Sequence, residues 1–186
     1  MKRIQVSASF FCLLAGLIFL DTEGLFLYFF LAAAVHELGH LLAIWLGGGK
    51  LLSFRLSGAG GVIRYRLPQA TVLRQAAIAL GGCTMGIVLA CGAAWAGQPL
   101  LSGASTLLTL FNLLPFRFLD GGRTLYLLFG KRIFLEVLGY GCLVVLFCFG
   151  GFMAIYWHGF GLLLIAFVLL FRQLSDLQPH PKQGMI

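Results

Sequence analysis

The sequence predicts an all-α polytopic membrane protein with about six transmembrane helices and a short β-hairpin inserted after the second helix. Of the 186 residues, 60% are hydrophobic and only 10% are charged, whereas a soluble globular protein has about 25% charged residues. The apolar residues form long runs, and the basic residues fall in the segments between them. We therefore expect one intramembrane domain over residues 1–186 whose surface faces the lipid bilayer.

Six apolar runs are long enough to be membrane helices: residues 4–20, 25–46, 75–96, 100–116, 133–149 and 152–171. The first run follows Lys2 and Arg3 like a signal peptide, but it has no small-residue cleavage site, so we expect an uncleaved span. The last two runs are separated only by Gly150 and Gly151, and residues 157–159 are an alternative place for the break.

The basic residues predict the orientation of these spans. With a cytoplasmic N-terminus, all 13 lysines and arginines fall on the cytoplasmic side, and the outer loops keep only Asp21 and Glu23 as charged residues. We therefore expect both termini in the cytoplasm. The basic residues are scattered without a continuous basic face, so we expect no nucleic-acid partner.

Residues 50–66 are too polar and too rich in glycine to span a membrane. Leu52, Phe54 and Leu56 alternate with polar residues, and Gly58 to Gly61 provide a turn before residues 62–66. This pattern predicts a β-hairpin. It is either a surface loop or a hairpin that reaches the membrane edge, where a free strand edge would accept an extended peptide.

The second span contains the motif His36-Glu37-Leu38-Gly39-His40. Residues four apart share a helix face, so both imidazoles can hold one metal ion, with Glu37 alongside to act as a general base on a water molecule. The five cysteines lie in apolar stretches without a C-x-x-C pair, so we expect them to be packing residues and not metal ligands.

A catalytic zinc ion takes three protein ligands and leaves a fourth position open. Asp120 is the best third candidate, because His158 and His180 fall on the opposite side and in the C-terminal tail. Taken alone, Asp120-Gly121-Gly122 also fits a simple turn that closes a helix. Pro115 interrupts the fourth span, which a membrane protein tolerates only beside protein or a water-filled cavity.

Together, H-E-L-G-H at 36–40 and N-L-L-P-x-x-x-x-D-G-G at 112–122 resemble the site-2 protease family of intramembrane zinc metalloproteases. The resemblance implies that His36, His40 and Asp120 bind zinc (Zn²⁺) and that Glu37 is the general base. It also implies that Asn112 and Pro115 shape a substrate channel. The family's third core span often carries Gly-Pro-x-x-Asn, whereas residues 81–86 here are Gly-Gly-Cys-Thr-Met-Gly.

The size resembles the small sporulation-type or archaeal branch, without a PDZ or nucleotide-sensing domain. This implies a prokaryotic cell membrane, a membrane-anchored protein as substrate, hydrolysis within or near its transmembrane segment, and control by a regulatory membrane protein. Two alternatives stay open. A zinc protease of the prenyl-peptide-processing type would use Glu136 as its third ligand, and a metal-binding transporter or inactive scaffold would not be an enzyme.

Overall fold

The structure is a computed structural model that describes residues 3–57, 60–130 and 133–177, and the chain divides into two compact units, Met1–Leu113 and Leu114–Ile186. Gly58 of the expected turn, His180 of the tail, and the basic residues at 2, 131, 132 and 182 lie outside the described residues. The predicted fold class is confirmed, because the chain is mainly helical and has a small sheet that includes a hairpin after the second helix.

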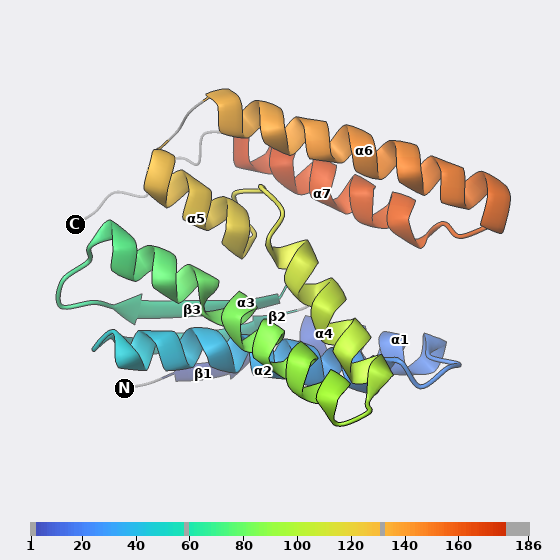
Figure 1. Ribbon diagram of the computed structural model, residues 1–186. Helices are drawn as coiled ribbons and strands as arrows, with labels where there is room; N and C mark the ends of the chain where they lie inside the picture. Colours follow the sequence, from blue (N-terminus) through green and yellow to red (C-terminus); the bar gives the residue numbers. More distant parts are fainter. Residues whose placement is uncertain (1–2, 58–59, 131–132, 178–186) are drawn as a thin grey trace. The chain divides into compact units, whose positions relative to one another are not determined.

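The first unit contains four helices and a three-stranded sheet (Figure 1). Its elements are β1 (Arg3–Val6), α1 (Ala8–Leu20), α2 (Phe26–Leu46), β2 (Lys50–Ser57), β3 (Gly60–Arg66), α3 (Val72–Trp95) and α4 (Pro99–Asn112). The start of α2 is capped by Asp21, whose carboxylate accepts the backbone N–H groups of Leu25 and Phe26 at 2.9 Å each. The start of α3 is capped by the Thr71 hydroxyl.

The predicted hairpin is present, and β2 and β3 pair antiparallel with Phe54 opposite Ile63. The structure adds a strand that we did not predict, because β1 pairs in parallel with β2 and places Ile4 opposite Phe54. Residues 4–6 therefore belong to the sheet and not to the first helix. The remaining helix α1 has 13 residues and is about 20 Å long, which is short for a bilayer core of about 30 Å.

Small residues let α2, α3 and α4 pack closely. A Cβ atom added to Gly81 of α3 would lie 2.7 Å from the Cβ of Ala43 on α2, and one added to Gly39 would lie 2.8 Å from the Met85 side chain. Ser105 of α4 donates a hydrogen bond to the Gly86 carbonyl of α3 at 2.8 Å. This close backbone approach, typical of membrane helices, holds the central part of α2 against α3.

The second unit contains α5 (Asp120–Phe129), α6 (Ile133–Trp157) and α7 (Gly161–Leu177), as Figure 1 shows. Helix α6 continues through Gly150 and Gly151, so the break falls at the alternative place, residues 157–159, where His158 has a φ of 54°. Glycine within a membrane helix is tolerated when neighbours pack against it, and Gly150 packs against Leu163 of α7.

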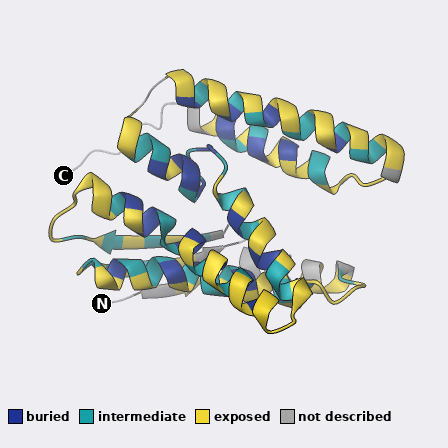
Figure 2. Cartoon of the chain, viewed as in Figure 1, coloured by how far each residue is buried: buried dark blue, intermediate teal, exposed yellow. Residues whose placement is uncertain are grey.

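Among the described residues, three helices are long and apolar enough to cross a membrane: Phe26–Leu46, Val72–Trp95 and Ile133–Tyr156. The number of six spans and their orientation remain predictions. Figure 2 shows that many residues along the helices are exposed. The exposed residues include large apolar ones such as Phe19, Trp95 and Ile133. Such a surface is stable against lipid and unstable against water.

Candidate metal centre

His36 and His40 of α2 lie side by side, one helical turn apart. Their Nε2 atoms are 3.2 Å apart, and their rings meet edge to face with centroids 4.9 Å apart. His36 is only 6% exposed. The helical spacing therefore brings the two imidazoles together as the sequence predicted.

The backbone of α3 fixes the orientation of His40. Its Nδ1 atom lies 2.8 Å from the carbonyl oxygen of Ile78. A carbonyl only accepts hydrogen bonds, so Nδ1 carries the proton and Nε2 carries the lone pair that faces His36. Such a contact to the far nitrogen is typical of histidines that bind metal ions.

Gly82 of α3 lets both imidazoles lie close against the α3 backbone. A Cβ atom added to Gly82 would collide with Nε2 of His40 and lie 2.6 Å from Nε2 of His36. Both nitrogens therefore converge on a part of α3 that has no side chain. Sequence reasoning had noted this segment only as a departure from the family pattern.

The spacing of the two nitrogens fits a tetrahedral metal ion. Two nitrogen ligands at about 2.0–2.1 Å from zinc and at the tetrahedral angle would be about 3.3 Å apart. The observed separation of 3.2 Å matches this value. The donor set and this spacing thus suit Zn²⁺.

Glu37 points toward the sheet. A Cβ atom added to Gly61 of β3 would lie 2.8 Å from Oε1 and 3.2 Å from Oε2 of Glu37. The carboxylate therefore lies between α2 and the beginning of β3, one position along the helix from His36. The hairpin runs back beside α2, since Gly61 meets a residue nine positions before the end of that helix.

Cys83 of α3 is the residue near the histidines that sequence reasoning missed. The residue is 3% exposed, and its Sγ atom lies within 4.8 Å of a ring nitrogen of His36. We had expected only a packing role for the cysteines, because no sequence spacing marks a thiol ligand. The available signal was its place next to Gly82, in the segment 81–86 that the sequence resemblance compares with Gly-Pro-x-x-Asn.

Asn112 is the last residue of α4, and its side-chain amide donates to the Leu108 carbonyl at 2.9 Å. The other two residues of this motif lie in the second unit. Pro115 is buried and follows the end of α4 by three residues, so it lies outside the helix and does not interrupt it. Asp120 is the first residue of α5.

The Asp-Gly-Gly sequence opens a helix here and does not close one. A Cβ atom added to Gly122 would collide with the backbone of Phe116, so only glycine allows the first turn of α5 to pack on the preceding segment. The Gly122 amide donates to the Leu114 carbonyl at 3.1 Å. The roles of Asp120, Asn112 and Pro115 in metal and substrate binding remain predictions.

Glu136, the alternative third ligand, has a different partner. Its carboxylate accepts a hydrogen bond from the guanidinium of Arg117, which also lies 4.5 Å from the centre of the Tyr126 ring. These three residues connect α5, α6 and the segment before α5 within the second unit. Glu136 is thus part of an ion pair that holds this unit together.

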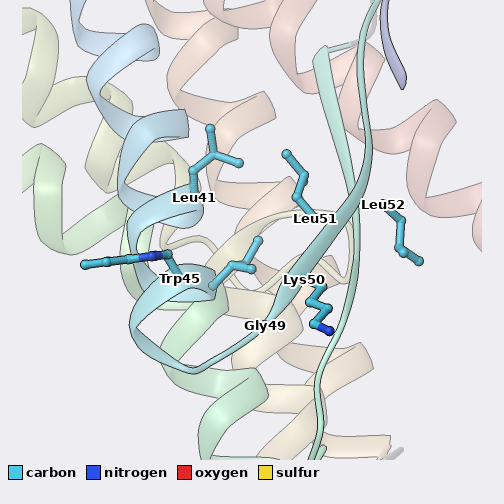
Figure 3. Close-up of a pocket in the computed structure, with 7 residues that line it drawn as sticks. Leu41, Trp45, Gly49, Lys50, Leu51 and Leu52 are labelled. Carbon is cyan, nitrogen blue, oxygen red and sulfur yellow. The ribbon is translucent and has the colours of Figure 1, made fainter. Parts of the chain in front are cut away.

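A cavity of about 530 Å³ lies between the end of α2 and the start of β2 (Figure 3). It is lined by apolar side chains and one cation: Leu41, Ile44, Trp45, Gly49, Lys50, Leu51 and Leu52. Neither His36 nor His40 lines it. A tryptophan next to a lysine is typical of the membrane–water interface, so we assign no chemistry to this cavity.

No family model and no curated protein matches the sequence. Among solved structures, the chain is similar to the site-2 protease from Methanocaldococcus jannaschii, with 21% sequence identity and a TM-score of 0.64. The similarity covers 100% of this chain and 95% of the archaeal chain. The chain therefore has the fold of that protein over its whole length.

Proposed function

We propose that this protein is an intramembrane zinc metalloendopeptidase of the site-2 protease family. It hydrolyses a peptide bond within or near the transmembrane segment of a membrane-anchored protein. The observation that carries the proposal is the pair of Nε2 atoms 3.2 Å apart that converge on Gly82, with the carboxylate of the adjacent residue Glu37 against Gly61 of β3. The similarity in fold supports the same conclusion.

His36 and His40 would hold zinc, which when bound polarises a carbonyl group and makes water more acidic. Glu37 accepts a proton from the attacking water on a carboxylate oxygen. It then passes this proton to the nitrogen of the leaving amine, as a general base and acid. The hydrogen bond from His40 to Ile78 keeps the histidine in the tautomer that presents a lone pair.

Asp120 is the proposed third ligand. It follows from the D-G-G element of the resemblance, and the pairing of Glu136 with Arg117 supports it over the alternative ligand. A carboxylate already paired with a guanidinium would have to leave an uncompensated charge behind to bind zinc. The hypothesis of a prenyl-peptide-processing enzyme is therefore the weaker one.

The edge of β3 is the proposed binding place for the substrate. In the described part of the sheet the strand order is β1, β2, β3, so one side of β3 faces away from its partner strand. An extended peptide that added to this edge at Gly61 would pass next to the Glu37 carboxylate. A substrate helix must unwind to bind in this way, because its own hydrogen bonds cover its carbonyl groups. Asn112 and Pro115 would shape the channel that admits it.

The position of the histidines within α2 predicts where cleavage occurs. His40 lies six residues before the end of α2 at Leu46, which places it about 9 Å along the helix from that end at 1.5 Å per residue. The basic residues of the hairpin favour a cytoplasmic location for this end. We therefore expect cleavage in the cytoplasmic part of the substrate's membrane segment, in a prokaryotic cell membrane and under the control of another membrane protein.

Glu37→Gln tests the proposed function. The substitution keeps the size of the side chain and removes its basicity, so we expect zinc content near one ion per chain and a rate of cleavage lower by about 10² to 10⁴. Glu23→Gln in the loop before α2 is the matched control and should cleave normally. The assay is cleavage of membrane-anchored substrates by purified protein in lipid, with elemental analysis of bound zinc.

The alternative of a metal-binding transporter or inactive scaffold predicts a different result. A zinc-loaded wild-type protein would then leave the membrane proteome uncut when fractions with and without it are compared. A Glu37→Gln variant that cleaves at the normal rate would show that another group is the base.

A further inference from the structure

We propose that Cys83 is a ligand of the same metal ion, so that His36, His40 and Cys83 bind it from within the first unit. The inference rests on the proposed function for the presence of an ion at the histidine pair. The thiolate of Cys83 would be an additional ligand, which the H-E-x-x-H and D-G-G elements do not include.

Helix α3 contributes three neighbouring features to this place. The carbonyl of Ile78 orients His40, Gly82 has no side chain at the point that both Nε2 atoms approach, and Cys83 follows at the next position. Sγ of Cys83 lies within 4.8 Å of a ring nitrogen of His36. Two ligands at about 2.3 Å (sulfur) and 2.0–2.1 Å (nitrogen) from one tetrahedral zinc would be about 3.6 Å apart. Rotation about the Cα–Cβ bond of Cys83 can move Sγ from its observed distance to the distance expected for two ligands of one ion.

The burial of Cys83 is consistent with this role but does not by itself indicate it, since buried cysteines often only pack. What distinguishes Cys83 is its distance from His36. Cys91, two turns further along the same helix, is exposed and serves as a comparison. Thiolate is a preferred ligand of zinc, and many zinc sites combine imidazole and thiolate ligands.

Coordination would exchange the S–H bond of Cys83 for a sulfur–metal bond and release one proton to water, without any change of oxidation state. A thiolate also neutralises one charge of the ion, which weakens its pull on a carbonyl group. If Asp120 binds as proposed, the protein supplies four ligands, the number typical of a site closed to water. Hydrolysis would then require Cys83 to leave, so the thiolate would hold the ion in a resting state.

Cobalt substitution tests the inference on the full-length protein in lipid. Co²⁺ bound through sulfur gives a charge-transfer band in the near ultraviolet, and its visible bands report tetrahedral geometry. We expect both in the wild type and in Cys91→Ser. Cys83→Ser should lose the charge-transfer band and keep the visible bands, because the histidines still hold the ion.

A second measurement needs no variant. X-ray absorption at the zinc edge of the wild-type protein should show a sulfur neighbour at about 2.3 Å. Bound zinc with only nitrogen and oxygen neighbours would overturn the role of Cys83 and leave the proposed function intact. A wild-type protein that binds neither metal would overturn both proposals.

Discussion

Gly82→Ala adds one methyl group at the point where the two histidines converge. Its Cβ atom would lie 2.6 Å from Nε2 of His36, which is 0.8 Å short of the 3.4 Å at which ordinary van der Waals contact begins, and it would also collide with Nε2 of His40. A retreat of α3 from α2 would give up the close packing of Gly81 on Ala43. We therefore expect the imidazoles to move.

A shift of this size is large compared with the tolerance of about 0.2 Å in metal–ligand distances. We expect zinc affinity to fall by 100-fold or more, which corresponds to about 2.7 kcal/mol. The fold should survive. Alanine favours a helix over glycine by about 1 kcal/mol, which partly offsets an overpacking cost of about 1–3 kcal/mol.

The assay is a zinc titration against a competing chelator, with helix content from circular dichroism. Gly92→Ala on the same helix is the matched control, since a Cβ atom there meets nothing within 4 Å, and its zinc affinity should equal that of the wild type. A Gly82→Ala protein with one zinc ion and unchanged affinity would refute the placement of the ion in front of Gly82.

Three further predictions follow from the same structure. Gly61→Ala should push the Glu37 carboxylate away and lower cleavage by roughly 10²-fold with zinc retained, whereas Val62→Ala at an exposed position should not. Asp120→Ala should weaken zinc binding and Glu136→Gln should not; elemental analysis with the reverse result would favour the prenyl-peptide-processing type. Reporters fused after Lys50 should be cytoplasmic and those near Gln98 exported, and a cytoplasmic Gln98 would contradict the six-span topology.

The helix that carries the candidate site was predictable because its signals are local. The i to i+4 spacing of His36 and His40 depends only on the helical repeat, and the long apolar run around it requires a helix in a membrane. The hairpin was predictable for the same reason, since its alternation and its glycines are read over a few residues.

The first strand could not be predicted in this way. Residues 3–6 join the sheet only because β2 offers an edge some 50 positions later in the chain, and no local pattern carries that information. Helix α5 was not predicted because the sequence D-G-G is also common in turns. The need for glycine at position 122 becomes clear only in the structure, where the backbone of Phe116 packs directly against Gly122.

The sequence by itself determined the membrane environment, the helix with two histidines and a glutamate, and the hairpin that follows it. Each depends on composition or on a spacing of a few residues along one element. Only the tertiary structure decided that the histidines meet Gly82, that Cys83 lies near His36, and that Gly61 meets Glu37. These relations join residues from different elements, which no spacing along one element reveals. The first two arise because glycines at the crossing of α2 and α3 let two backbones approach closely, and the third arises because a glycine in β3 leaves room for the Glu37 carboxylate.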